Sequence, residues 1–365
     1  MTTTYRYLFA DLLTNDIIAE LPLTGVSFTQ QLNQAGTFQG HLLLSGINSF
    51  GYNVDASTQP ARNALYVDRN GVLVWGGIIW GRSYNSASQT LSITAREFES
   101  YFEKRLITTT QAYTNQDQLL IARDLINNAQ TAPYGDIGVI VGTETSGVLV
   151  DRVFYDYEKK GVWQGIKDLS NQDDGFDFNI TVDYDPLTNE PTKTLVLGYP
   201  RTGTVYNVND PYAYVFEFPA GNIVEYEYPE DGSIAVNALY AIGAGSNEGK
   251  LISFADDTSK FATGWPLLEA QVNYSDITDQ TVLDELATGQ VLALSEPPPI
   301  IKVVVPAFIQ PVFGTYSIGD DARLRIIDER FPTGLDAIYR IVGLNVQPGE
   351  DGPERVTITL TVTTN

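Results

Sequence analysis

The chain of 365 residues is 43% hydrophobic, which indicates a globular protein of two or three domains. Its 45 acidic and 22 basic residues give a formal net charge of −23, which argues against nucleic-acid binding by phosphate neutralisation and against docking on anionic membranes. The lack of cysteine and the single histidine, His41, exclude disulfides, thiolate sites and histidine clusters, so no metal or cofactor is predicted.

Residues 1–106 have the pattern of a small β domain. Apolar and polar residues alternate in short runs, and Asn70-Gly71 favours a tight hairpin because such turns need positive φ angles. The spacing of Phe98, Tyr101 and Phe102 then indicates a short helix between residues 95 and 105. We expect a first β unit over residues 1–106.

Residues 107–219 change to an α+β pattern. Residues 114–117 resemble a capping box, and Leu119, Ala122 and Leu125 follow on one helical face. A second helix is expected over residues 161–169. Residues 176–182 and 194–199 read as a hairpin with a turn-rich connection.

The chain returns to a β pattern from residue 220. Residues 221–228 alternate and are expected to pair with residues 237–245, and a helix is expected over residues 279–294. Pro297, Pro298 and Pro299 are expected to end that helix. We assign a second β unit to residues 220–255 and 300–365, with a helical insertion over residues 256–299. The fold class is therefore mostly β, with two similar small β units separated by a middle α+β domain.

Two stretches near opposite ends of the chain repeat one pattern of strand, turn, strand with a glycine-bearing bend, loop and strand. Symmetric homo-oligomers commonly close into rings, so a trimer of a chain with two such units would present six of them around one axis. A six-fold object of this kind can dock on a three-fold one. The stretches are residues 64–71, 72–80 and 89–95, and residues 322–330, 338–344 and 354–362.

No stretch of the sequence carries a strong catalytic or metal-binding motif. Residues 243–249 resemble a dinucleotide fingerprint only superficially, because the third glycine is late and no βαβ pattern surrounds it. Asp183 and Asp185 lie in a turn whose spacing differs from that of a calcium loop. Pairs of carboxylates, such as those at Asp173 and Asp174, are expected by chance among 45 acids. We predict no catalytic and no metal-binding residue.

Aromatic residues leave two readings open. The 21 tyrosines and four tryptophans could stack on sugars, or they could fill a core and interfaces. Trp75 and Trp80 lie five residues apart, on opposite faces of a strand unless a bulge intervenes. We name Trp75, Trp80 and Arg82 as candidate interface residues. A β-rich carbohydrate-binding or adhesin-like surface protein is the alternative function, and an acidic glycan hydrolase is a third.

A series of short stretches in a fixed order, none diagnostic alone, covers nearly the whole chain. Together they resemble the minor tail proteins of long-tailed phages, especially those infecting actinobacteria, and the central hub of phage baseplates. The stretches are residues 74–80, 96–105, 175–178, 197–201, 221–223, 242–245, 266–269, 274–276, 319–326 and 340–343.

The resemblance implies a non-enzymatic homotrimeric hub in the virion, with two tube-forming β-barrels per subunit that make a pseudo-hexameric ring at the tail tip. Expected partners are the tail tube or distal tail protein and other tip proteins, with assembly in the host cytoplasm and no membrane anchor. Because the last strand ends near residue 365, no additional cell-wall-binding domain is expected.

A ring of this kind encloses a channel through which DNA would pass without specific binding. Acidic side chains on its wall would repel DNA and let it slide. The candidate lumen acids are Glu225, Glu227, Asp320 and Asp321.

Overall fold

The structure, a computed structural model, describes residues 3–45, 53–172, 174–274, 277–295, 299–349 and 352–362. The chain divides into two compact units, residues 1–226 with 302–365 and residues 227–301. The expected fold class is confirmed, because the chain is mostly β with large antiparallel sheets.

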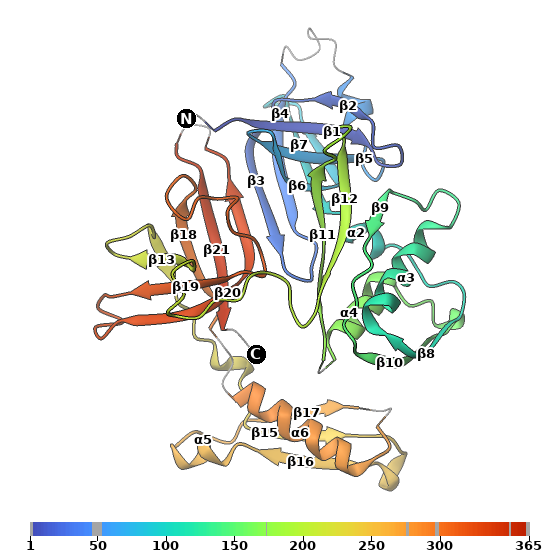
Figure 1. The fold of residues 1–365 in the computed structure, drawn as a ribbon, viewed down its shortest axis with the longest axis vertical. Helices are drawn as coiled ribbons and strands as arrows, with labels where there is room; N and C mark the ends of the chain where they lie inside the picture. Colours follow the sequence, from blue (N-terminus) through green and yellow to red (C-terminus); the bar gives the residue numbers. More distant parts are fainter. Residues whose placement is uncertain are drawn as a thin grey trace. The chain divides into compact units, whose positions relative to one another are not determined.

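The amino-terminal half of the first unit contributes one run of strands to a 13-stranded sheet, in the order β3-β4-β7-β6-β5-β1-β2 (Figure 1). The expected Asn70-Gly71 hairpin is confirmed, since these residues join β5 to β6 at φ values of 55° and 88°. The elements are β1 (Tyr5–Asp11), β2 (Ile17–Glu20), β3 (Thr24–Gln31), β4 (Thr37–Leu43), α1 (Val54–Ser57), β5 (Asn63–Arg69), β6 (Val72–Asn85), β7 (Thr90–Glu97) and α2 (Glu99–Phe102).

The carboxyl-terminal half continues the same sheet. Its order is β14-β18-β21-β20, with β19 on β20 and β13 on β19. The strands are β13 (Tyr214–Phe218), β14 (Glu225–Glu227), β18 (Ile301–Pro306), β19 (Asp321–Ile326), β20 (Leu335–Gln347) and β21 (Arg355–Val362).

The two halves have the same strand topology. The series β3-β4-β7-β6-β5-β1 is matched by β14-β18-β21-β20-β19-β13, in the same chain order. One pairing differs, because β1 is antiparallel to β5 whereas β13 is parallel to β19. Residues 32–36 connect β3 to β4, and the second unit occupies the corresponding place in the chain between β14 and β18.

A bulge repeats at the same position of both halves. The pairing of β6 with β7 skips Trp80, between Ile79 and Gly81, and the pairing of β20 with β21 skips Val342, between Ile341 and Gly343. A bulge adds one residue and bends its strand, so both middle strands bend at corresponding points.

The hydrogen bond beside the bulge repeats as well. The amide of Ala61 donates to the carbonyl of Ile79, and the amide of Gly319 donates to the carbonyl of Ile341, both at 2.7 Å. Each donor lies two residues before its strand and has positive φ, 62° at Ala61 and 96° at Gly319. The pattern repeated in the sequence therefore corresponds to a repeat in the backbone.

The middle region is α+β, with one hydrophobic core shared with β5 and β6. The helix expected after residue 117 is confirmed, but its cap is Asp117, whose carboxylate accepts from the amide of Leu119 at 2.9 Å, rather than Thr114. The elements are β8 (Gln111–Asp117), α3 (Gln118–Gln130), β9 (Val139–Val141), β10 (Leu149–Phe154), η2 (Asp156–Glu158), α4 (Val162–Ser170), β11 (Asp177–Tyr184) and β12 (Pro191–Gly198).

The second unit is a small sheet with one long helix. β15 pairs with β16 and β17, and α6 packs Leu283 and Ala287 against Ala241. The expected pairing of residues 221–228 with 237–245 is wrong, because β14 belongs to the large sheet. The second unit begins at Glu227, whereas the helical insertion was expected to begin at residue 256. The elements are η3 (Gly232–Ile234), β15 (Ala238–Ile242), η4 (Asn247–Gly249), β16 (Ile252–Asp256), α5 (Thr258–Ala262), β17 (Glu269–Asn273) and α6 (Gln280–Ser295).

The helix expected over residues 279–294 is thus confirmed as α6. Pro297 and Pro298, expected to end it, lie outside the described residues, as does Asp173.

Candidate functional site

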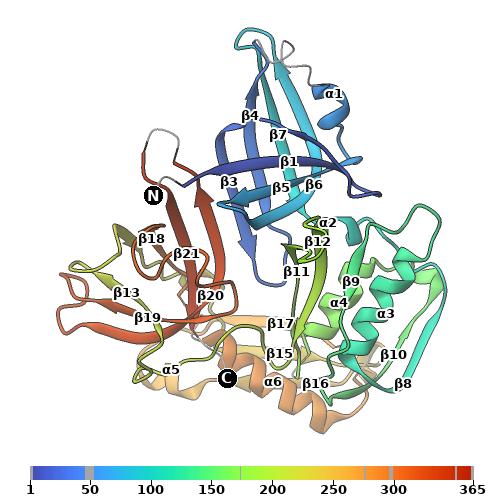
Figure 2. The same cartoon turned by 45° about the horizontal axis from the view of Figure 1, so that its top comes forward.

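The two β halves are joined by a direct pairing of β20 with β3. Gly343–Val346 run antiparallel to Phe28–Gln31, and the amide of Leu32 donates to the carbonyl of Val342 at 3.0 Å. β20 therefore changes partner at its bulge, because residues 335–340 pair with β19 and residues 343–346 pair with β3. Figure 2 shows β3 and β20 as neighbours between the blue and red parts of the sheet.

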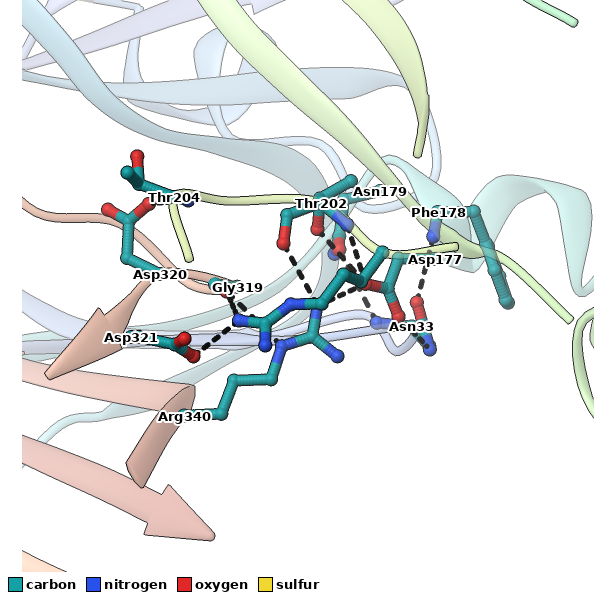
Figure 3. Close-up of polar contacts among 11 residues, drawn as sticks. Asn33, Asp177, Phe178, Asn179, Thr202, Thr204, Gly319, Asp320, Asp321 and Arg340 are labelled. Carbon is teal, nitrogen blue, oxygen red and sulfur yellow. Dashed lines mark hydrogen bonds and ion pairs between the residues drawn. The ribbon is translucent and has the colours of Figure 1, made fainter. Parts of the chain in front are cut away.

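A buried polar cluster lies beside this pairing (Figure 3). Arg340, on β20, forms an ion pair with Asp177, on β11, and its guanidinium also donates to the carbonyls of Gly319 (3.2 Å) and Thr202 (3.1 Å). Asp177 in turn accepts from the amide of Thr202 (2.7 Å) and from Asn33 Nδ2 (3.2 Å). One carboxylate thus connects the β3–β4 turn, the middle region and the carboxyl-terminal half.

A second ion pair belongs to the same cluster. Arg201 bonds Asp321 at 2.5 Å and the carbonyl of Gly319 at 2.8 Å, and the amide of Tyr206 donates to Asp321 at 3.1 Å. Asp320 accepts from the amides of Thr204 (2.7 Å) and Ser317 (2.8 Å). These bonds tie the segment after β12 to the start of β19.

Asp320 and Asp321 therefore need correction as candidate lumen acids. Their exposed fractions are only 8% and 1%. Carboxylates that are buried and paired do not present charge to a channel. Asp320 and Asp321 instead follow a turn at Gly319 and accept hydrogen bonds from the amides of Ser317, Thr204 and Tyr206 and from the Arg201 side chain.

Two further acids are buried between β7 and α2. Glu97 accepts from the amide of Gly36 at 2.6 Å, and Glu99 accepts from the amide of Ile180 at 2.6 Å. Burial, and then the neighbouring Glu99, raises the pKa of Glu97 well above its usual range. Burial also raises the pKa of Glu99, to about 7. Glu97 thus links the end of β7 to the β3–β4 turn, and Glu99 links α2 to β11.

The solvent side of the joined sheet is hydroxyl- and amide-rich. Side chains opposite one another in the registers share a face, and the row Thr357, Asn345 and Thr29 crosses from β21 over the β20–β3 junction. We call this surface the polar face, and its described residues include no carboxylate. They include Ser27, Thr29, Gln31, Thr37, Gln39, His41, Ser92, Thr94, Arg96, Asn345, Gln347, Arg355, Thr357 and Thr359.

The polar face is hollowed. A shallow depression of about 450 Å³ lies over the junction and is lined by Thr29, Thr37, Trp80, Arg96 and Asn345 among others. The single cation there is Arg96, which pairs with Glu103 at 2.7 Å. Over the whole polar face the cations are Arg96 and Arg355, in a chain of net charge −23.

Of the three candidate interface residues, Trp75 is corrected by the structure. It is fully buried, and its Nε1 donates to the carbonyl of Thr29 at 3.0 Å, so it belongs to the core. Trp80 is half-buried at the bulge, where its Nε1 donates to Ser100 Oγ at 2.8 Å. Arg82 donates from Nη1 to the carbonyl of Asp55 at 3.1 Å and lies partly exposed on β6.

The remaining candidates lie apart from the junction. Glu225 and Glu227 are exposed on β14. His41 lies on the polar face with Nδ1 3.0 Å from Ser92 Oγ. Within the described ranges, no group of three His, Cys, Asp or Glu side chains could hold a metal ion. In the same ranges, no helix is long and apolar enough to cross a membrane.

The fold is similar to that of several solved structures. A tail protein from Neisseria meningitidis aligns over 97% of this chain and 96% of its own, with a TM-score of 0.63 and 15% identity. The 43 kDa tail protein of prophage MuSo2 from Shewanella oneidensis aligns over 98% of both chains, with a TM-score of 0.65 and 13% identity. The chain has the fold of phage tail proteins.

A prophage tail protein from Listeria monocytogenes also shares this tail-protein fold, with a TM-score of 0.51 and 11% identity over 97% of this chain and 94% of that one. No protein-family model matches the chain, and no curated protein matches it in sequence. The likeness to tail proteins is therefore one of backbone, and it extends over both β halves.

Proposed function

We propose that the chain is a structural, non-enzymatic hub of a phage tail tip, which trimerises into a pseudo-hexameric ring. The observation that carries the proposal is the repeated topology, with its bulge at Trp80 in one half and at Val342 in the other. Three copies supply six similar units, which matches a six-fold tube on one side and three-fold tip proteins on the other.

The buried polar cluster beside the β20–β3 pairing supports this role physically. A ring closes only if the angle between neighbouring units is constant, and here the angle between the two halves is held by main-chain pairing and by two ion pairs whose carboxylates are buried. Removing one partner of a buried pair leaves an uncompensated charge, so the alternatives to this geometry are costly. The cluster acts as a brace rather than as a catalytic site.

The polar face is our candidate for the channel wall. It is hollowed, spans both halves and carries two cations, Arg96 and Arg355, but no carboxylate among its described residues, so it offers exiting DNA few groups to bind. DNA would pass over it without specific binding, while the acid excess elsewhere discourages adsorption. Glu225 and Glu227 stay candidate lumen acids at the end of the sheet, next to β18.

In this proposal the protein resides at the tail tip of the virion after assembly in the host cytoplasm. Its partners are further copies of itself, the tail tube or distal tail protein, and other tip proteins. The tail-protein fold supports this placement because the alignment covers both halves and the middle region.

The mass of the purified chain tests the proposal. We expect a trimer by analytical ultracentrifugation, and end-on averages of electron micrographs should show a ring with six similar lobes. A monomer at every concentration, alone and with tail partners, would count against the hub. A monomer that binds glycans in the hollow beside Trp80 would favour the carbohydrate-binding alternative.

A further inference from the structure

The carboxyl-terminal part of β6 has one edge that the described strands leave unpaired. The corresponding edge of β20, in the other half, is paired with β3. β6 pairs with β5 only over residues 72–78, whereas its pairing with β7 continues to Asn85. Among the described residues, no main-chain hydrogen bond reaches residues 81–85 from the β5 side. Ser83, Tyr84 and Asn85 are exposed, with Tyr84 at 53%.

In the other half the corresponding edge is covered. Aligning the bulges places Gly81 on Gly343, so residues 81–84 correspond to Gly343–Val346, which pair with β3. The same bond precedes both segments, from Ala61 to Ile79 and from Gly319 to Ile341. The backbone approaching the two edges is therefore alike, and the open one has the shape of a strand-accepting edge.

We propose that residues 81–84 of β6 pair with β14 of a second copy of this chain, as Gly343–Val346 pair with β3 within one copy. β14 is the choice because it occupies the position of β3 in the repeated topology and is the last strand of the sheet at that end. An open strand edge is a template for strand addition, and such edges are normally covered in native assemblies. The inference rests on the proposed trimer and specifies its contact.

The contact is head-to-tail, because it uses different surfaces of the two copies. Such contacts form a closed ring when the rotation from one copy to the next adds up to a full turn, and they form filaments when it does not. If the contact between copies has the geometry of the β20–β3 junction, every unit meets the next in the same way. Three copies then close the ring, and the polar face continues around it.

The proposal identifies the main-chain groups that take part. The carbonyl of Val342 points to β3, and strand groups alternate between edges, so Leu344 and Val346 also face β3. Their counterparts on β6 are Arg82 and Tyr84. The Arg82 side chain is already paired within its own copy, since it donates to the carbonyl of Asp55 in α1 and to Thr58 Oγ1 at 2.9 Å.

A cross-linking experiment tests the pairing, because the chain has no cysteine and introduced thiols are unique. One preparation carries Ser83→Cys, and three others carry Glu225→Cys, Tyr226→Cys or Glu227→Cys. After mixing and mild oxidation, we expect a disulfide-linked dimer for at least one combination, since opposed Cα atoms of paired strands lie within disulfide range. The double variant Ser83→Cys/Ser92→Cys is the control for oxidation, because these residues are opposed within one chain.

A proline variant tests the same edge without cross-linking. Tyr84→Pro removes only the amide that faces the open edge, where proline is tolerated, whereas Tyr84→Ala keeps that amide and removes the ring. We expect Tyr84→Pro to raise the concentration for half-assembly at least tenfold, with Tyr84→Ala close to the parent and equal unfolding temperatures of the monomers. A trimer without any cross-link, unaffected by Tyr84→Pro, would overturn this pairing and leave the hub standing. A chain that never assembles would overturn both.

Discussion

Arg340 and Asp177 are 163 residues apart in the chain, and their side chains form an ion pair with exposed fractions of 16% and 8%. We expect Arg340→Ala to lower the free energy of unfolding by about 3 kcal/mol, because it leaves the Asp177 carboxylate buried without its partner. Asp177→Ala should cost a similar amount. The double variant should lose less stability than the sum of the two single losses, because the two side chains contact each other. Urea denaturation of the parent, the two single variants and the double variant measures this difference.

The control for this cycle is a pair on the surface. Arg62 lies 3.7 Å from Asp11, and its side chain is 67% exposed. Exposed pairs contribute little, so Arg62→Ala should leave the denaturation midpoint nearly unchanged. Additive losses at Arg340 and Asp177 would show that the two side chains do not act together, and the brace would then rest on β20–β3 pairing alone.

Ala61 and Gly319 occupy corresponding positions in the two halves. We expect Ala61→Gly and Gly319→Ala to have opposite effects on the free energy of unfolding. Ala61 is held at a φ of 62°, a conformation that is strained for alanine, so Ala61→Gly should raise the free energy of unfolding by up to about 1 kcal/mol. The higher conformational entropy of glycine in the unfolded chain offsets part of this gain. Gly319→Ala should lower it by about 1–3 kcal/mol, since the new Cβ would lie 2.7 Å from Thr202 Oγ1 at a φ of 96°.

The matched control is Gly232→Ala, where a Cβ meets nothing within 4 Å and φ is not positive. Thermal unfolding of the three variants against the parent gives the order. If Ala61→Gly were destabilising, the backbone bond to Ile79 would need a different explanation from the one to Ile341.

The buried acids predict that stability depends on pH. The pKa of Glu99 is raised by burial to about 7 in the folded chain, against 4.5 as its ordinary value, so the folded chain holds that proton more tightly than the unfolded one. The associated stability is fully present below about pH 4.5 and is lost as pH rises through about 7. Glu99→Gln should therefore flatten the fall in stability between pH 5 and 8, by about 1 kcal/mol per pH unit at most.

Urea denaturation at several pH values measures this slope. Glu158→Gln, at an exposed position in η2, serves as the control and should follow the parent at every pH. A parent whose stability does not fall from pH 5 to 8 would contradict the raised pKa of the buried pair.

Local patterns in the sequence predicted the elements well. Asn70-Gly71 fixes its hairpin because the turn needs positive φ at both residues, and α4 and α6 lie where apolar spacing places them. The repeat was also visible, since each copy keeps a strand, a glycine-bearing bend and a strand. Such features depend on residues close in the chain.

Features set by distant residues were not predictable in this way. β15 pairs with β16 and β17 rather than with the strand over residues 221–228, and alternation alone does not select a partner. Asp320 and Asp321 looked like surface acids because an acidic pair in a turn usually is one, and Arg201 and Tyr206 lie more than 100 residues away. Nothing near Asp177 in the sequence indicates Arg340. The sequence therefore did not predict the junction between β20 and β3.

The polar face predicts a distinctive pattern of chemical access in the assembled protein. Thr29→Cys places a thiol over the β20–β3 junction, and Leu187→Cys places one at the tip of the β11–β12 hairpin, where the side chain is 94% exposed. If the polar face lines the channel, a small maleimide should label both thiols in the trimer. A maleimide on a long polymer should label Leu187→Cys much faster than Thr29→Cys, because the bore admits the bulky reagent slowly.

Diluted monomers should show similar rates at the two positions. Equal rates in the trimer would mean that the polar face lies outside the ring, and the channel wall would have to be sought on another surface.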